Sequence, residues 1–228
     1  MALLEISSAC SGYGGAPVLK DVSLSIDEGE VVALLGSNGA GKSTTILTIG
    51  GEVPLASGTI EFDGATLRGP LHSRAKQGIA LITDDRSLFA QMSVRDNLKL
   101  GRSDMALALD LFGELGPLLN RRAGLLSGGE QQMLSVARVL AARPRVVLVD
   151  ELSLGLAPLI VDRLLNAISE VASTGTAVLL VEQHARKALA VADRAYVLCR
   201  GSVQLEGSGS SLLERFDEVQ RAYLSPGA

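Results

Sequence analysis

Short runs of consecutive apolar residues recur along the chain, and stretches with helical spacing separate the later ones. The apolar runs are typical of strands buried on both faces, and they occupy residues 31–35, 79–82, 146–149, 177–181 and 195–198. Helical spacing is found at residues 128–142, 158–171 and 185–192. Strands that alternate with helices predict an α/β fold whose mostly parallel sheet is covered on both faces.

The N-terminal part has a different pattern, in which apolar and polar residues alternate. Alternation at residues 3–8 and 22–26, and a strand at 59–62 that ends in Asp63-Gly64, predict half-buried antiparallel strands packed beside the parallel sheet. A glycine-rich turn is expected at residues 11–15. Leucines with helical spacing between residues 93 and 119 predict two or three short helices that form a small subdomain.

The C-terminal end is predicted to contain one more hairpin and two short helices. The hairpin turns at Arg200-Gly201, and its last strand covers residues 202–205. The chain has 228 residues and is 47% hydrophobic, which is enough for one sizeable core or a core with a subdomain. We therefore treat residues 1–228 as a single domain and expect its helical subdomain at approximately residues 85–140.

Charge and hydropathy exclude several functional classes. The net charge of −4 argues against nucleic acid as a partner, because a nucleic-acid-binding surface would leave a basic excess. No apolar run approaches the roughly 18 residues that a membrane-spanning helix needs. The first ten residues have no positively charged segment of the kind that opens a signal peptide.

A glycine-rich loop follows the first buried strand and reads GSNGAGKST. A strand, such a loop and a helix form the phosphate-binding P-loop, in which backbone N–H groups surround the phosphates of a nucleotide. Lys42 is predicted to reach the β- and γ-phosphates, and the Ser43 hydroxyl to bind Mg²⁺. The predicted nucleotide-binding residues here are Gly36, Ser37, Asn38, Gly39, Ala40, Gly41, Lys42, Ser43 and Thr44.

Two carboxylates, Asp150 and Glu151, end the buried strand at residues 146–149. Ligands of open α/β sheets bind at the carboxyl ends of the strands. We expect Asp150 to help hold the Mg²⁺ ion that Ser43 binds, and Glu151 to act as general base or to position the attacking water. A solvated strand end is the alternative, and the P-loop in the same sheet makes it the weaker one.

The segment LSGGEQQ at residues 126–132 precedes a predicted helix. Ser127 followed by Glu130 has the spacing of a capping box, so an ordinary helix start explains part of the pattern. The glycine pair also allows an anion to approach the free N–H groups of the helix. Ser127, Gly128 and Gly129 are therefore candidates for a second phosphate contact.

The order of these three motifs resembles that of the ATP-binding cassette (ABC) ATPases, over essentially the whole chain. The resemblance implies a P-loop NTPase fold that binds ATP with Mg²⁺ and hydrolyses it. It also implies a head-to-tail dimer in which Ser127, Gly128 and Gly129 of one chain contact the γ-phosphate held by the other. Tyr13 lies in the position of the aromatic residue that stacks on adenine, although a surface tyrosine in a turn is nearly as good an explanation.

Further segments are similar to the ATPases of branched-chain amino acid importers, of the LivF type. They are SLGLAP after Glu151, VEQ at residues 181–183 and the C-terminal pattern DRAYVL…G…LEG…AYL. The similarity implies permease subunits in the membrane, a secreted solute-binding protein, a homodimer or a pair with a sister ATPase, and a place at the cytoplasmic face of the cell membrane. Related importers of urea or short amides share much of this pattern.

Two positions depart from the usual ABC pattern. Asp84 falls where most members have a glutamine that contacts Mg²⁺, and Gln183 falls at the position of the catalytic histidine, with His184 one residue later. A carboxylate at position 84 can still bind Mg²⁺, and Gln183 can donate to phosphate without carrying charge. Two alternatives therefore stay open, a soluble ABC ATPase not coupled to transport and a weakly hydrolysing nucleotide-binding partner.

Overall fold

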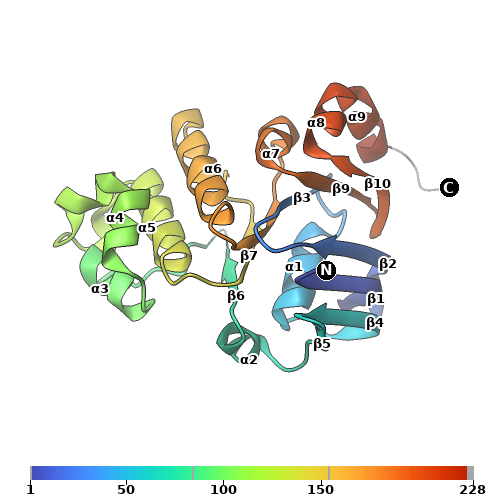
Figure 1. The fold of residues 1–228 in the computed structure, drawn as a ribbon, viewed down its shortest axis with the longest axis horizontal. Helices are drawn as coiled ribbons and strands as arrows, with labels where there is room; N and C mark the ends of the chain where they lie inside the picture. Colours follow the sequence, from blue (N-terminus) through green and yellow to red (C-terminus); the bar gives the residue numbers. More distant parts are fainter. Residues whose placement is uncertain (1, 84, 154, 225–228) are drawn as a thin grey trace.

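Two β-sheets form the framework of the molecule in the computed structural model, which describes residues 2–83, 85–153 and 155–224 (Figure 1). The larger sheet has the order β10-β9-β3-β8-β7-β6. Its strands in that order are Ser202–Ser208, Arg194–Cys199, Val31–Gly36, Ala177–Val181, Val146–Asp150 and Ile79–Ile82. All neighbours in it are parallel except β10, which forms an antiparallel hairpin with β9, so the predicted mostly parallel sheet is confirmed.

The smaller sheet is antiparallel and has the order β2-β1-β4-β5. Its strands are Ala16–Ile26, Leu4–Tyr13, Leu55–Phe62 and Ala65–Thr66. Strand β1 is longer than the sequence predicts, because Ser11, Gly12 and Tyr13 pair with β2, so the turn expected at residues 11–15 shrinks to Gly14 and Gly15. Cross-strand pairing outweighs the low strand propensity of Gly12, and it also extends β4 and adds the unpredicted β5.

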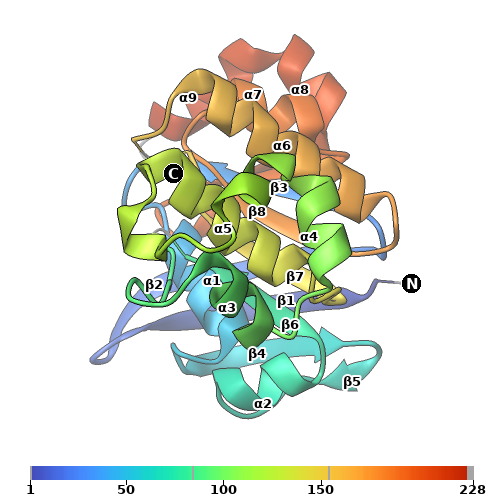
Figure 2. The ribbon, with the colours of Figure 1, turned by 90° about the vertical axis from the view of Figure 1, so that its left-hand side faces the viewer.

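Helices cover both faces of the larger sheet, as its continuous apolar strands predict. Helix α1 (Lys42–Gly50) lies between the two sheets, whereas α5 (Gly128–Leu140), α6 (Pro158–Ala172) and α7 (Ala185–Val191) lie on the opposite face (Figure 2). Alternate residues of β3 belong to the two cores: Ala33 and Leu35 pack toward the α5–α7 side, and Val32 and Leu34 pack toward α1. This arrangement places the carboxyl ends of β3, β7 and β8 along one edge.

A group of short helices lies to one side of the larger sheet (Figure 1). It contains α3 (Val94–Leu100), α4 (Met105–Leu111) and the 3-10 helices Gly113–Leu118 and Ala123–Leu125, and they pack around the fully buried Phe112. The prediction of two or three short helices is confirmed. Helix α2 (Leu71–Lys76) was not predicted, whereas α8 (Gly209–Glu214) and α9 (Phe216–Leu224) are the two expected C-terminal helices.

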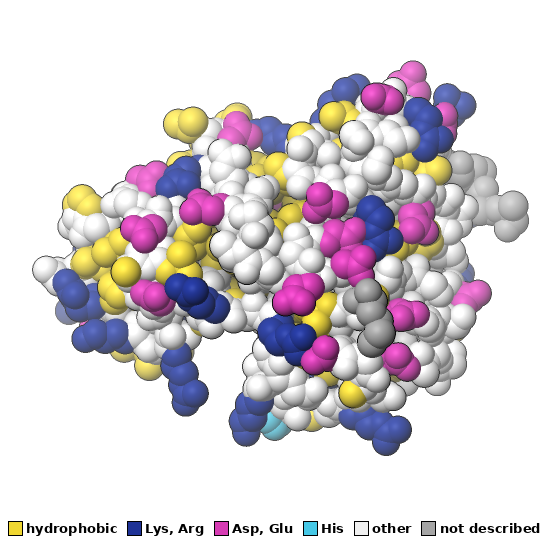
Figure 3. Space-filling model, in the orientation of Figure 1, with side chains coloured by type: hydrophobic (Ala, Val, Ile, Leu, Met, Phe, Trp, Pro, Cys, Tyr) yellow, Lys and Arg dark blue, Asp and Glu magenta, His cyan; other side chains and the backbone are white. Residues whose placement is uncertain are grey.

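Within the described part of the chain, no helix is long and apolar enough to cross a bilayer. Side chains of both signs are scattered over the face drawn in Figure 3.

Candidate active site

The loop between β3 and α1 is held tightly against the larger sheet. A Cβ atom on Gly36 would lie 2.4 Å from the carbonyl oxygen of Leu198 on the neighbouring strand, so only glycine allows this approach. Gly41 precedes α1 with φ +109°, a left-handed conformation that side chains disfavour. The loop therefore has the curled backbone, followed at once by a helix N-terminus, that phosphate binding requires.

Lys42 begins α1 and is almost completely buried, with 4% of its surface exposed. Its Nζ donates hydrogen bonds to the carbonyl oxygens of Gly36 at 3.0 Å and Ser37 at 3.2 Å. The same atom lies 3.9 Å from Oε1 of Glu151. Burial lowers the pKa of Lys42, and the nearby carboxylates, Glu151 foremost, offset part of that effect.

A chain of polar contacts joins α1 to the ends of β7 and β8. The Ser43 hydroxyl donates to Oδ1 of Asp150 at 3.2 Å. Glu151, the next residue, accepts a hydrogen bond of 2.8 Å at Oε2 from Nε2 of Gln183. The predicted Lys42, Ser43, Asp150, Glu151 and Gln183 are thus brought together at the edge where parallel strands end.

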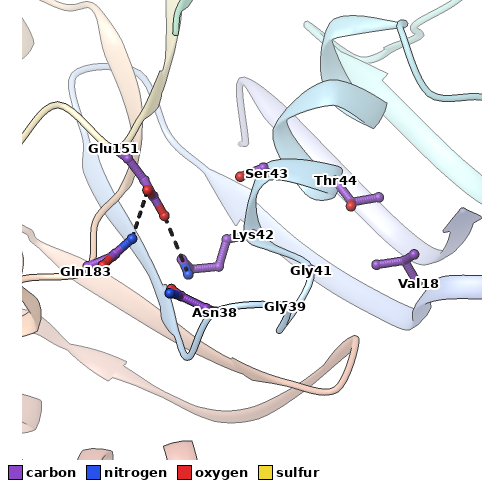
Figure 4. A pocket seen from close by; sticks show the side chains of 9 residues that line it. All are labelled: Val18, Asn38, Gly39, Gly41, Lys42, Ser43, Thr44, Glu151 and Gln183. Atoms are coloured by element: carbon purple, nitrogen blue, oxygen red, sulfur yellow. Dashed lines mark hydrogen bonds and ion pairs between the residues drawn. The ribbon is translucent and has the colours of Figure 1, made fainter. Parts of the chain in front are cut away.

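Lys42, Ser43, Glu151 and Gln183 line a cavity of about 280 Å³ (Figure 4). Figure 4 shows the Glu151 side chain between those of Gln183 and Lys42, with Ser43 and Thr44 at the start of α1. The described residues that line it are Val18, Asn38, Gly39, Gly41, Lys42, Ser43, Thr44, Glu151 and Gln183. Val18 was missed from the sequence, because an apolar residue in an alternating strand gives no signal beyond that of a core position.

Tyr13 and His184 are not among the described residues that line this cavity. Tyr13 ends β1 with 53% of its surface exposed. His184 is exposed and immediately precedes α7. Asp84, the residue predicted at the position of a Mg²⁺ contact, lies outside the described residues.

The second glycine-rich segment begins α5 away from the cavity. Ser127 and Glu130 form the predicted capping box: the Ser127 N–H donates to Oε2 of Glu130 at 2.6 Å, and the Glu130 N–H donates to Oγ of Ser127 at 3.3 Å. The bond from the Ser127 backbone lowers the pKa of Glu130. Ser127 and Gly128 are exposed, and Gly129 packs so closely on α6 that a Cβ there would lie 3.2 Å from Cγ1 of Ile160.

Arg86, which was not predicted as a site residue, links the loop after β6 to the start of α5. Its Nε donates to Oε1 of Gln132 at 3.0 Å, and its Nη1 donates to Oε1 of Gln131 at 2.9 Å. The Ser135 hydroxyl donates to the carbonyl oxygen of Arg86 at 2.8 Å. A positively charged side chain is therefore fixed beside Gly128, at the helix end that attracts anions.

A buried carboxylate, Glu182, was also missed, although it lies between the predicted Gln183 and the end of β8. It is 1% exposed and accepts two hydrogen bonds from Ser153, one from the backbone N–H at 3.1 Å and one from the hydroxyl at 2.5 Å. Burial raises the pKa of Glu182, and the bonds from Ser153 partly oppose this. The sequence does contain one indication of this residue, because Glu182 is a charged residue that directly follows a fully buried strand.

Comparisons with known proteins agree with this geometry. The family model described as ABC transporter matches residues 19–153. The branched-chain amino acid transport ATP-binding protein BraG of Pseudomonas aeruginosa is 39% identical, over 97% of this chain and 99% of its own. The lipopolysaccharide export ATP-binding protein LptB of Escherichia coli is 35% identical over 98% of both chains, and a probable LivF of Archaeoglobus fulgidus is 36% identical over 90% of this chain and 91% of its own.

Solved structures give the same answer for the fold. The ATP-binding subunit of an ABC transporter superposes with a TM-score of 0.83 at 27% identity, covering 98% of this chain and all of that one. The chain therefore belongs to the ATP-binding subunits of ABC transporters, and the predicted fold class and ATPase activity are confirmed at the level of that family. Within it, the similarity to branched-chain amino acid transport ATPases that the sequence indicated is also found.

Proposed function

We propose that this chain is the ATP-hydrolysing subunit of an importer for branched-chain amino acids or a related small amide or amino acid. The observation that carries the proposal is the likeness to BraG over nearly the full length of both chains. The assembled set of Lys42, Ser43, Asp150 and Glu151 supports hydrolysis rather than a purely regulatory role.

ATP binding is assigned to the P-loop. The N–H groups of residues 36–44 and the ammonium group of Lys42 would surround the β- and γ-phosphates. Lys42 now donates to two loop carbonyls, so its Nζ already points into the loop. We keep Tyr13 as the proposed adenine contact, with Val18 on the cavity wall as an apolar neighbour of the nucleotide.

A magnesium ion fits the oxygen atoms between α1 and β7. Mg²⁺ takes one or two carboxylates together with substrate phosphates and waters. Oγ of Ser43 and Oδ1 of Asp150 lie 3.2 Å apart, and both are hard oxygen donors of this kind. The ion would neutralise the negative charge of the phosphates, and Asp84 remains a proposed further ligand.

Hydrolysis is assigned to Glu151 as the group that accepts the proton of the attacking water. Its carboxylate lies at the cavity, 3.9 Å from Lys42, and the hydrogen bond from Gln183 fixes its orientation. Gln183 is thus proposed to position the base. His184 is retained only as a candidate, since its side chain is exposed outside the cavity.

A second chain is proposed to complete the site. Ser127 and Gly128 are exposed at the start of α5 and are not part of the cavity. The first N–H groups of a helix have no partner within the helix, so they can bind a γ-phosphate presented by another chain. The partner is another copy or a sister ATPase, and a head-to-tail dimer would hold two ATP molecules.

The membrane partner is proposed to contact the segment after Arg86 and the 3-10 helix Ala123–Leu125. Phe89 and Leu125 are exposed by 54% and 62%, and the two segments are joined by a hydrogen bond of 2.8 Å from the Gly124 N–H to the carbonyl oxygen of Ala90. Exposed large apolar side chains suit an apolar helix of a permease. We accordingly place the chain at the cytoplasmic face of the membrane, with a helical subdomain at residues 85–140.

The transported solute is tested with the complete transporter. The chain would be assembled in lipid nanodiscs with candidate permease subunits and a solute-binding protein from the same organism, and the ATPase rate measured with leucine, urea or no solute. Stimulation by leucine-loaded binding protein supports the proposal. Stimulation by urea alone would show that the substrate is a small amide rather than a branched-chain amino acid. No response to either solute contradicts import of this class.

Lipopolysaccharide export is the second candidate, because LptB is 35% identical over 98% of both chains. The same nanodisc assay separates the two. An ATPase rate that responds to lipopolysaccharide and to neither leucine nor urea would favour export.

A further inference from the structure

The backbone of Glu151 adopts a conformation that a non-glycine residue needs help to hold. Its φ is +47°, in the left-handed region, although its neighbour Asp150 still belongs to β7. Such a conformation is unfavourable for a residue with a Cβ atom and persists only where surrounding contacts enforce it. The contacts that enforce it are therefore part of what positions this carboxylate.

Three consecutive residues at the end of β8 supply these contacts. The carbonyl oxygen of Val181 accepts the Glu151 N–H at 3.0 Å, and Gln183 donates to the Glu151 side chain at 2.8 Å. Between them, Glu182 binds Ser153, two residues after Glu151, through both of its carboxylate oxygens. The segment that follows β7 is thus held at the Glu151 backbone, at the Glu151 side chain and at Ser153.

We propose that Glu182 is a positioning residue for hydrolysis, which fixes the turn after β7 through Ser153 and so holds Glu151 at the γ-phosphate. Glu182 and Ser153 are 1% and 5% exposed, so water does not compete for these two hydrogen bonds. Leu152, between Glu151 and Ser153, is also buried, and its packing further restricts the conformation of the turn. The inference rests on the role proposed above for Glu151.

The test compares variants of Glu182 and Ser153 in the full-length chain. Because a displacement of about 1 Å can cost ~10²-fold in rate, Glu182→Ala should lower kcat about tenfold or more. KM and the Kd for ATP should stay within about twofold, since the P-loop keeps its contacts. Glu182→Gln keeps a hydrogen-bonding partner for the N–H and for the hydroxyl of Ser153, so it should retain most of kcat. Ser153→Ala loses one of the two hydrogen bonds, so its kcat should lie between those of Glu182→Gln and Glu182→Ala.

Thr176→Val is the matched control. Thr176 directly precedes the first residue of β8, at the end of the strand away from Glu182. Like Ser153 it is buried, with 7% of its surface exposed, and its hydroxyl donates one hydrogen bond of 3.0 Å to the carbonyl oxygen of Pro144. This variant should lower Tm without lowering kcat. Native kcat in Glu182→Ala, or a Glu182→Gln variant as slow as Glu182→Ala, overturns the inference. If Glu182→Ala does not fold, native kcat in Ser153→Ala overturns it. Glu151→Gln run in parallel tells the two proposals apart, since native activity there would remove the proposed base itself.

Discussion

The two glycine-rich segments of this chain, residues 36–44 and 127–129, lie in opposite surroundings. In the first, Lys42 is buried and its charge is met by Glu151 and by loop carbonyls of the same chain. In the second, Ser127 and Gly128 are exposed, the cap is formed with Glu130 of the same helix, and the nearby Arg86 donates to Gln131 rather than to the segment itself. One segment is built into a site within the chain, whereas the other presents a helix N-terminus outward.

The difference suggests a division of the proposed catalytic work. The groups proposed to hold Mg²⁺ and to accept a proton need fixed partners, and residues at the ends of β7 and β8 supply such partners. A helix N-terminus needs only an approaching anion, so it can be donated by a second chain. Hydrolysis would then depend on both segments, but ATP binding to the single chain would depend on the first alone.

The largest effect is expected for Glu151→Gln. The amide has nearly the same shape but cannot accept the proton of the water, so hydrolysis should fall ~10²-fold or more. ATP should still bind, and the trapped ATP should favour a dimer in size-exclusion chromatography. Glu214→Gln on the surface of α8 is the control for the charge change. A native rate in Glu151→Gln would mean that another group is the base.

Lys42→Ala tests the first segment, residues 36–44, through its affinity for ATP. The loss of a charge-assisted phosphate contact of ~1.5–3 kcal/mol should weaken ATP binding about tenfold or more. Isothermal calorimetry measures this directly, with the exposed Lys76→Ala as control. Unchanged affinity would refute the P-loop assignment.

Gly128→Asp breaks the second segment while sparing the fold. A carboxylate in the first turn of α5 is favoured by the helix dipole, so Tm should not fall. The same charge would repel a γ-phosphate by ~1–4 kcal/mol and should lower the ATPase rate about tenfold or more, with ATP affinity of the single chain unchanged. Weakened ATP binding to the monomer would contradict the division between the two segments.

Mixing the two defective chains sharpens the comparison further. In a head-to-tail dimer of Lys42→Ala with Gly128→Asp, one site carries both defects and the other carries neither. Because half of randomly formed dimers would be mixed, an equimolar mixture should regain about a quarter of the native ATPase rate if the sites act independently. No recovery above the separate variants would contradict the shared site.

The smallest effect is expected at an ion pair that belongs to neither segment. Glu30, at the opposite end of β3 from the P-loop, accepts hydrogen bonds from Arg194 at 2.5 and 3.0 Å. Burial alone raises the pKa of Glu30, but the bonds from Arg194 and from the Asp27 N–H outweigh it, and the pKa lies below its ordinary value. A lowered folded-state pKa stabilises the protein above the unfolded value and is lost as pH falls through the folded value.

Glu30→Gln should therefore reduce the free energy of unfolding by ~1–3 kcal/mol at pH 7. Urea unfolding should show that the gap from the native chain shrinks as the pH drops below about 4, where Glu30 becomes protonated. The ATPase parameters at pH 7 should stay unchanged. A gap that is equally large at pH 7 and at pH 3.5 would show that the Glu30 charge is not its source.

The sequence by itself determined the elements whose signal is local. The continuous apolar runs of β3, β7 and β8 predict buried parallel strands, the glycines and Lys42 predict the P-loop, and Ser127 with Glu130 predicts the cap that the structure contains. Where polar residues or glycine continue a strand, the predicted bounds were too narrow: β1 extends past its predicted end through Gly12, and β4 begins before its predicted start and includes Gly58. Pairing with a neighbouring strand, rather than propensity, decided those boundaries.

Only the tertiary structure decided which distant residues touch. Ser153 and Glu182 are 29 positions apart and carry no shared motif, and their two hydrogen bonds exist because β7 and β8 are neighbours in the sheet. Arg86 reaches Gln131 and Gln132 because the loop after β6 crosses the start of α5. Local patterns specify helices, strands and turns through short-range sterics and burial, whereas these contacts depend on strand order and helix placement, which are fixed when the whole core packs.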